Sequence, residues 1–273
     1  MKLATVRVAG GGTRVVRIAG DVATEVPGFA NVGALLAAGG LDAAATAPGP
    51  EHAVAGLDYA TLVPAPSKVV CVGLNYKAHI AETHREPPTY PTLFAKFADS
   101  LIGAHDDIVR APEPESMDWE GELVIVIGAE VRRARGAEAE AAIAGYTIAN
   151  DVSYRDWQYR TTQWDQGKIW ADSTPVGPVL ATPDEIPFQA RIVTELDGVV
   201  KQEGEIHDLV HGPAALVEYV STITRLRPGD LILTGTPSGV GHVRQPEEQL
   251  LPGQTVTVTI DGIGSLRNRI VAG

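Results

Sequence analysis

Three acidic side chains alternate along one short segment of the chain, in the sequence MDWEGELVIVIG. Because the side chains of a β-strand alternate between its two faces, we expect Asp118, Glu120 and Glu122 to share one face. The continuation LVIVIG is apolar on both faces, which predicts a buried strand. Buried like charges repel unless a cation neutralises them, and an all-oxygen site suits Mg²⁺, Mn²⁺ or Ca²⁺ better than zinc. A solvated strand end is the alternative for an isolated E-x-E pattern.

A further carboxylate, Asp151, stands where the β-type run in GYTIANDVS ends. The following Ser153 could cap a helix that we expect to extend to about Thr162. An Asn-Asp pair before a helix more often forms a turn or a cap than a metal site. Local sequence therefore does not distinguish Asp151 from a turn residue.

Cationic and amide side chains follow this segment. Arg155 and Gln158 are three residues apart, so on a helix they would share a face and could bind an anionic substrate together. Surface salt bridges are the alternative. Lys168 follows a glycine and precedes apolar residues, a setting that could bring its ammonium into a cleft, although an exposed lysine is the ordinary interpretation.

A histidine and a glutamate lie three residues apart in GLNYKAHIAETH. A short helix from Lys77 to Thr83 would place His79 and Glu82 on one face. A carboxylate in this position can orient an imidazole that acts as a general base for water. An incidental H-x-x-E pair on a surface helix is the alternative.

Two other patterns have chemical interpretations. His207 and His211 have the spacing of helical zinc ligands but lack the glutamate of H-E-x-x-H, so we interpret them as structural. The backbone amides of the glycine-rich segment GTPSGVG could bind an anion, but the segment lacks the Gly-Lys-Ser/Thr ending of a nucleotide P-loop.

The elements around these residues are mainly strands. Ala4 to Val8 and Thr13 to Ile18 flank a run of three glycines, which predicts a hairpin, and a Pro-rich boundary near residues 64–67 separates a small N-terminal domain, 1–66, from a larger domain, 67–273. Strands do not alternate regularly with helices, so a doubly wound parallel sheet is disfavoured and a β-rich α+β fold with a mixed sheet is expected. The remaining predicted helices are Asn31 to Ala38, Ala137 to Ala144 and Ala214 to Thr222.

Composition limits the partners. The chain has 273 residues, is 44% hydrophobic and carries a formal net charge of −12, so it can bury a large core but offers little attraction for nucleic acid or anionic lipid. We find neither a signal-peptide pattern nor a run of about 20 apolar residues that could span a bilayer. The single cysteine, Cys71, lies in an apolar run and fits a reducing cytoplasm.

Taken in order, several motifs resemble the fumarylacetoacetate hydrolase family from about Lys68 to Ile270. They are G-L-N-Y-x-x-H-x-x-E, D-W-E-G-E-L-x-x-V-I-G, G-Y-T-x-x-N-D-x-S-x-R-D-x-Q, G-K, P-x-G-P and P-G-D-x-I-x-T-G-T-P-x-G-V-G. The resemblance implies a mixed β-sheet roll with a small N-terminal domain, assembled as a homodimer. It also implies a metal site for Mg²⁺, or alternatively Mn²⁺ or Ca²⁺, at Glu120, Glu122 and Asp151.

The same resemblance assigns roles to the other polar residues. Substrate-binding and oxyanion-stabilising positions correspond to Arg155, Gln158, Lys168 and Thr236, and Lys96 corresponds to a lysine near the site. His79 and Glu82 correspond to residues of a lid helix. The segment after His84, REPPTYP, contains Arg85 and Tyr90 but predicts no pocket shape.

These assignments predict an enzyme that binds a small 2-oxo or diketo acid. Our first hypothesis is hydrolysis of a carbon–carbon bond in an acylpyruvate-type diketo acid such as fumarylpyruvate, through an enolate held by the metal, with His79, Glu82 and Lys168 as catalytic residues. The second is decarboxylation or isomerisation of a 2-oxo dicarboxylate at the same site, of the 2-hydroxyhepta-2,4-diene-1,7-dioate isomerase or oxaloacetate decarboxylase type. The third is a binding protein whose carboxylates hold a structural ion.

Overall fold

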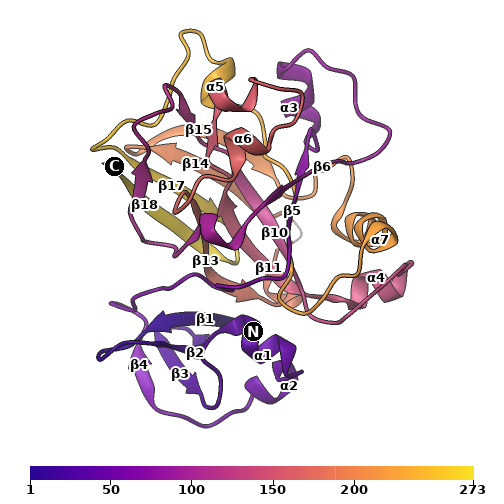
Figure 1. The fold of residues 1–273 in the computed structure, drawn as a ribbon. Helices are drawn as coiled ribbons and strands as arrows, with labels where there is room; N and C mark the ends of the chain where they lie inside the picture. The colour runs from indigo at the N-terminus through magenta and orange to yellow at the C-terminus, as the bar shows by residue number, and fades with distance from the viewer. Residues whose placement is uncertain (188) are drawn as a thin grey trace.

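The computed structural model describes residues 1–187 and 189–273 and is rich in strands, which confirms the predicted β-rich fold with mixed sheets. The N-terminal residues form a small lobe that lies beneath the larger body in Figure 1. One sheet passes through both parts, because β1 (Lys2–Arg7) pairs with β13 (Thr174–Ala181) through Lys2 and Leu3. The division into domains at residues 66 and 67 remains a prediction.

The N-terminal lobe contains the predicted hairpin. Its strands β1 and β2 are antiparallel, with Arg7 opposite Thr13, and the turn between them contains three glycines with φ between 86° and 96°. Such positive φ angles suit glycine, which has no Cβ to clash with the backbone. The elements of the lobe are β1 (Lys2–Arg7), β2 (Thr13–Ala19), β3 (Val22–Val26), β4 (Glu51–Ala53), α1 (Val32–Ala37) and α2 (Leu41–Ala44).

The large sheet has eleven strands, and ten of them follow the order β4-β3-β2-β1-β13-β11-β10-β16-β5-β6, while β7 pairs with β13. Most neighbours are antiparallel, but β16 and β5 are parallel. The strands beyond the N-terminal lobe are β5 (Val69–Gly73), β6 (Thr92–Lys96), β7 (Leu101–Ile102), β10 (Gly121–Ile127), β11 (Ile143–Asn150), β13 (Thr174–Ala181) and β16 (Leu231–Leu233).

A five-stranded sheet with the order β15-β14-β17-β18-β8 packs against the large sheet, and β9 pairs with β12 in a separate ribbon. The buried side chains between the sheets include Leu123, Ile148, Ile192 and Val258. Each such aliphatic side chain contributes about 1.5–3 kcal/mol when fully removed from water. The bounds are β8 (Ile108–Arg110), β9 (Met117–Asp118), β12 (Ser153–Tyr154), β14 (Arg191–Leu196), β15 (Val199–Glu205), β17 (Thr255–Ile260) and β18 (Gly264–Ala272).

Strand β10 is buried along its whole length, as its sequence predicts. Leu123, Ile125 and Ile127 share one face, which packs against the five-stranded sheet and α7 (Pro213–Ile223). Val124 and Val126 on the other face belong to the buried cluster that contains Leu3. The strand that leads away from Glu120 and Glu122 is therefore fixed from both sides.

The helices are short, and two of them correct our predictions. They are α3 (Lys77–Glu82), α4 (Ala137–Ala141), α5 (Arg155–Gln158), α6 (Asp165–Lys168) and α7 (Pro213–Ile223), with 3₁₀ turns at Ala98–Ser100, Pro183–Glu185 and Gly241–Val243. The predicted helix 137–144 is shorter because Ile143 begins β11.

The helix predicted from Ser153 to Thr162 is reduced to the single turn α5. Ser153 and Tyr154 pair with Asp118 and Met117 in the β9–β12 ribbon, so they cannot be helical. Ser153 does not cap the helix either, since its hydroxyl donates to the carbonyl of Asp151 at 2.9 Å. The competing partner is distant in sequence, and the local pattern gives no sign of it.

Within the described residues, every helix is too short or too polar to cross a membrane.

Candidate functional site

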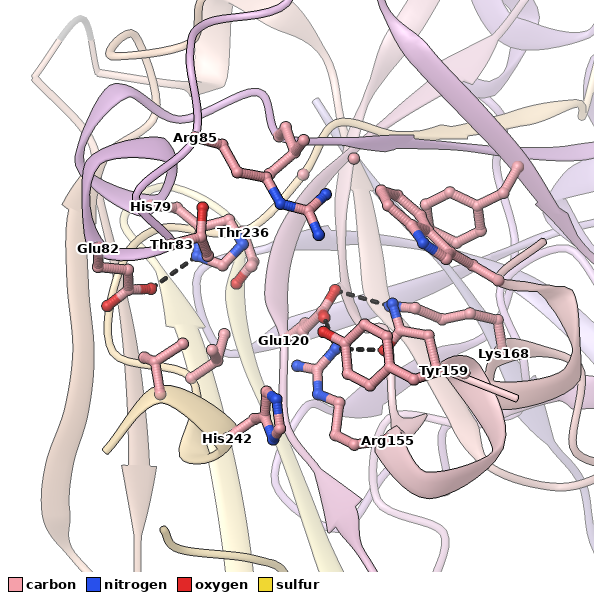
Figure 2. A pocket seen from close by; sticks show the side chains of 18 of the residues that line it. His79, Glu82, Thr83, Arg85, Glu120, Arg155, Tyr159, Lys168, Thr236 and His242 are labelled. Atoms are coloured by element: carbon pink, nitrogen blue, oxygen red, sulfur yellow. Dashed lines mark hydrogen bonds and ion pairs between the residues drawn. The ribbon is translucent and has the colours of Figure 1, made fainter. Parts of the chain in front are cut away.

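A cavity of about 370 Å³ lies between α3 with the segment that follows it, the start of β10, helices α5 and α6, and the glycine-rich segment after β16 (Figure 2). Most of the residues that the sequence singled out line this cavity: His79, Glu82, Glu120, Glu122, Arg155, Gln158, Lys168 and Thr236. Asp151 and Lys96 lie buried and ion-paired next to them. The fold thus brings all ten predicted site residues to one place.

The three predicted metal ligands form one buried cluster. Glu120, Glu122 and Asp151 each offer an oxygen within 4.8 Å of the others, and their exposures are 7%, 1% and 0%. The register of the antiparallel strands explains this, because Gly121 lies opposite Asn150 and the amide of Asp151 donates to the carbonyl of Glu120 at 2.8 Å. Two carboxylates from the β10 end of the sheet thereby meet one from the β11 end.

The electrostatics of the cluster fit a divalent cation. Burial raises the pKa of Glu122 well above its ordinary value, and the charges of Asp151 and Glu120 raise it further. The backbone amide of Gly235 donates a hydrogen bond to Glu122 Oε2 at 2.7 Å. The negative charge of the three converging carboxylates is only partly neutralised by neighbouring cations. Together they form a hard, all-oxygen donor set of the kind that binds Mg²⁺, Mn²⁺ or Ca²⁺.

Two lysines compensate part of this negative charge. Lys96 Nζ lies 2.7 Å from Asp151 Oδ1, and Lys168 Nζ lies 2.7 Å from Asp151 Oδ2 and 2.8 Å from Glu120 Oε2. Burial alone would lower the pKa of Lys168, but the charges of Asp151 and Glu120 outweigh it and raise that pKa above its usual value. Lys168 is therefore a permanent cation on the cavity wall, and it is ion-paired with two carboxylates of the cluster.

Arg155 is held by a second set of acceptors. Its guanidinium donates from Nε and Nη2 to Asp118 Oδ2, at 2.9 and 2.7 Å, and Nη1 donates to Gln158 Oε1 at 2.8 Å. Nη1 also lies 2.7 Å from Glu120 Oε1. Although burial would raise the pKa of Glu120, the charges of Lys168 and Arg155 hold it far below its ordinary value. Asp118 thus positions the arginine, in agreement with its place outside the predicted ligand set.

His79 and Glu82 make the predicted contact. The imidazole Nδ1 lies 2.6 Å from Glu82 Oε1, and both side chains lie at the cavity (Figure 2). The amide of Gly239 donates to Glu82 Oε2 at 2.9 Å, which fixes the carboxylate from the other side. Gly239 has φ of 101°, and a Cβ on it would stand 2.2 Å from the carbonyl oxygen of Lys201, so this position requires glycine.

The backbone amides of the glycine-rich segment bind carboxylate side chains of the protein itself. Its amides donate to carboxylates: Gly235 to Glu122, Gly239 to Glu82 and Gly241 to Asp118. Thr236 supports the same region, because its hydroxyl donates to the carbonyl of Gly121 at 3.0 Å and accepts from the amide of Gln202 at 2.7 Å. The sequence indicated the capacity of this segment to bind an anion but not the identity of the anion.

Several cavity residues received no role from the sequence. Arg85, Tyr159, Trp164 and His242 line the cavity, and Arg85 lies three residues after the end of α3. Tyr90, which the sequence placed beside Arg85, instead stacks on Tyr219 with ring centroids 6.2 Å apart. The sequence places Arg85 close to His79, which could have suggested a role at the site. However, the sequence of a polar loop does not predict where the side chain of a basic residue points.

Comparison with known proteins agrees with this geometry. The family model for the C-terminal domain of fumarylacetoacetate hydrolase matches residues 68–271. A human protein named "Oxaloacetate tautomerase FAHD2A, mitochondrial" is 40% identical over 210 residues, which cover 76% of this chain and 67% of that protein.

Two solved structures cover the whole chain. A fumarylacetoacetate hydrolase from Exiguobacterium antarcticum superposes with a TM-score of 0.89 at 30% identity, and the match covers 100% of both chains. A 5-carboxymethyl-2-hydroxymuconate delta-isomerase from Mycobacterium smegmatis gives a TM-score of 0.82 at 33% identity, again over 100% of both chains. With the matched family model and the carboxylate cluster, these similarities show that the chain belongs to the fumarylacetoacetate hydrolase family.

Proposed function

We propose that this chain is a divalent-metal-dependent enzyme that converts a 2-oxo dicarboxylate through its enol form, as an isomerase or tautomerase, with decarboxylation as the related reaction at the same site. The observation that carries the proposal is the buried cluster of Glu120, Glu122 and Asp151 at the wall of a cavity that also holds His79. The names of a tautomerase and an isomerase among its relatives support this choice over hydrolysis.

Glu120, Glu122 and Asp151 would hold the cation, which we propose to be Mg²⁺, with Mn²⁺ or Ca²⁺ as alternatives. When bound, such an ion polarises a carbonyl oxygen and stabilises the negative charge that develops there. Arg155 and Lys168 extend the positive potential along the same wall, so an anionic 2-oxo acid would bind with its carboxylate toward them.

His79 is our candidate for moving the proton. Since Glu82 accepts from Nδ1 at 2.6 Å, Nε2 is the ring nitrogen left to take a proton from the carbon next to the keto group or to return it. Glu82, itself fixed by the amide of Gly239, would hold the ring in this tautomer. General acid–base catalysis of this kind contributes about 10²–10⁴-fold.

Hydrolysis of an acylpyruvate, our first hypothesis from the sequence, is the second candidate. The observation that favours it is the same His79–Glu82 pair, since an oriented imidazole can also activate water. Both reactions need the carboxylate cluster, so the cluster cannot distinguish them.

Three substrates distinguish the reactions. The purified protein with Mg²⁺ is given enol oxaloacetate, keto oxaloacetate and an acylpyruvate, and enol absorbance and pyruvate release are followed separately. We expect the enzyme to accelerate the conversion of enol to keto oxaloacetate, and to release pyruvate more slowly from keto oxaloacetate and from the acylpyruvate. Fastest turnover of the acylpyruvate would favour the hydrolase, and no rate above the metal-only control with any substrate would contradict both. The Glu120→Gln variant serves as the inactive control.

Two further expectations belong to this proposal. Assembly as a homodimer and a cytoplasmic location, both inferred from the sequence, remain predictions, and the human relative is named as mitochondrial. Size-exclusion chromatography with light scattering would test the assembly.

A further inference from the structure

One permanent cation of the cavity has no acidic partner among the residues that the structure describes. Arg85 lines the cavity, and within residues 1–187 and 189–273 its guanidinium makes no hydrogen bond or ion pair. The other two permanent cations of the lining, Arg155 and Lys168, are both bonded to carboxylates of the site. Figure 2 shows the Arg85 side chain reaching from the segment after α3 into the cavity, above Glu120. Its charge is thus available to a ligand.

The end of α3 fixes the direction of this side chain. The amide of His84 donates to the carbonyl of Ala81 at 3.1 Å, and the amide of Arg85 donates to that of Ile80 at 3.3 Å. These two bonds, with φ of 55° at His84, form a Schellman motif that ends the helix and reverses the chain. Arg85 leaves this turn on the side of the cavity, which is also lined by His79, six residues earlier on α3.

The cations around the carboxylate cluster are already ion-paired, so none of them is free to bind a second anionic group of the substrate. The site holds three cations, Lys96, Lys168 and Arg155, and all three are ion-paired with its carboxylates Asp118, Glu120 and Asp151. A fourth carboxylate, Glu122, belongs to the same cluster. The carboxylate and keto oxygen of a 2-oxo acid would be matched there with the help of the ion. A second carboxylate at the far end of the substrate would project away from the cluster. Arg85 lies on that side (Figure 2), and in the described part of the chain it is free of any ion pair.

We propose that Arg85 binds the distal carboxylate of the substrate and makes the site selective for 2-oxo dicarboxylates over 2-oxo monocarboxylates. The inference rests on the proposed function and adds a specificity residue to it. A guanidinium presents paired N–H donors that match the two oxygens of a carboxylate, whereas an ammonium acts as a point charge. Arg85 therefore contributes to substrate affinity without taking part in proton transfer.

Equilibrium binding tests the inference independently of turnover. With Mg²⁺ present, the quenching of tryptophan fluorescence, for which Trp164 lines the cavity, gives dissociation constants for 2-oxoglutarate and for 2-oxobutyrate. Loss of a hydrogen-bonded charge pair costs about 1.5–3 kcal/mol, so Arg85→Gln should bind the dicarboxylate about 10- to 100-fold more weakly. Its affinity for the monocarboxylate should change less than about twofold. Arg85→Lys should fall between Arg85→Gln and the unchanged chain.

The matched control is Lys77→Gln, which removes a positive charge from the same short helix. Lys77 is 68% exposed in its side chain and lies 3.1 Å from Asp208, outside the cavity lining. This variant should bind both ligands as the unchanged chain does. If Arg85→Gln weakens both ligands equally, or neither, Arg85 does not read the distal carboxylate and the inference is wrong.

Failure of the proposed function has a different result. If the unchanged chain prefers the dicarboxylate and loses this preference in Arg85→Gln, but converts no 2-oxo acid, the proposed reaction is wrong while Arg85 remains a binding residue. If the unchanged chain does not prefer the dicarboxylate, the inference itself fails.

Discussion

The ammonium of Lys96 and the carboxylate of Asp151 lie 2.7 Å apart, and neither side chain has measurable solvent exposure. Lys168 reaches the other oxygen of the same carboxylate, also at 2.7 Å. Each carboxylate oxygen of Asp151 is thus paired with a buried ammonium group, and Asp151 also belongs to the acidic cluster. Removal of either cation leaves buried negative charge with less compensation, and an uncompensated buried charge is costly.

Lys96→Met should destabilise the fold by about 3–5 kcal/mol, because it leaves Asp151 with less compensation. The free energy of unfolding, measured in urea with a chelator present, tests this. Adding Asp151→Asn to the same chain should recover part of the loss. The increase in stability on addition of Mg²⁺ should be greater in Lys96→Met than in the unchanged chain, since the ion replaces the lost positive charge. Equal stability of the variant and the unchanged chain would show that the pair is not needed.

Binding of a divalent cation should stabilise the folded chain by mass action, by about 2.7 kcal/mol when the free ion is at 100 times its dissociation constant. Glu122→Gln should abolish this increment, because it removes a charged oxygen from the three-carboxylate set. Thermal unfolding with Mg²⁺ or Mn²⁺, and with a chelator, measures the effect. The control is Glu130→Gln, which changes an exposed carboxylate paired with Arg225 and should keep the full increment. An increment that survives Glu122→Gln would place the ion elsewhere.

His79→Ala should reduce kcat by about 10²–10⁴-fold for the reaction that the enzyme performs, since it removes the proton-transferring group. Glu82→Gln should reduce kcat less, because the imidazole remains but loses its orienting partner. Both variants should keep the metal-dependent rise in Tm, as neither residue belongs to the carboxylate cluster. His52→Ala, at an exposed position on β4, is the control. Unchanged turnover in His79→Ala would exclude the role that we give to this residue.

The Schellman turn predicts opposite effects of two substitutions at His84. His84→Gly should be tolerated, because glycine adopts the observed φ of 55° without cost. His84→Val should weaken the turn by about 1–2 kcal/mol, since a β-branched residue is strained in this region. We expect His84→Val to raise KM for the dicarboxylate substrate and to speed amide hydrogen exchange at the end of α3. Similar KM values for the two variants would mean that the turn does not position Arg85.

The N-terminal lobe should contribute a pH-dependent part of the stability through Glu25. The hydrogen bond from Arg14 lowers the pKa of Glu25, burial opposes this, and the contact with His52 lowers it again. A carboxyl whose pKa is lower in the folded chain stabilises the fold above its unfolded pKa, and this contribution is lost as the pH falls through the folded value.

Glu25→Gln should therefore be less stable than the unchanged chain at neutral pH, by about 1 kcal/mol or less. The difference should shrink as the pH is lowered through the acid range. Urea unfolding of both chains at a series of pH values measures it. A difference that stays constant with pH would assign the loss to packing instead of charge.

Local spacing predicted much of the site correctly. The contact between His79 and Glu82, and that between Arg155 and Gln158, both join residues three apart on one helical turn, so a short helix is sufficient to form them. The alternation of Glu120 and Glu122 likewise follows from an extended backbone that leads into a buried strand. The hairpin at the N-terminus and helix α7 also follow from local patterns.

Other features could not be predicted, because their partners are distant in sequence. Asp118 and Ser153, which are 35 positions apart, pair in a ribbon, and this pairing replaced the helix expected from Ser153 to Thr162. The sequence indicates that the glycine-rich segment has backbone amides available to donate hydrogen bonds. Only the fold determines that one of them, of Gly239, donates to Glu82, 157 residues earlier.

The sequence by itself thus determined which chemical groups are present and which near neighbours share a face, because backbone geometry relates residues a few positions apart. The tertiary structure decided how the charges compensate one another: Lys96 and Lys168 with Asp151, Arg155 with Asp118, and Arg85 without an acidic partner among the described residues. The physical reason is that strand order and register bring distant side chains within 3 Å, and burial then makes each such pairing, or its absence, energetically important.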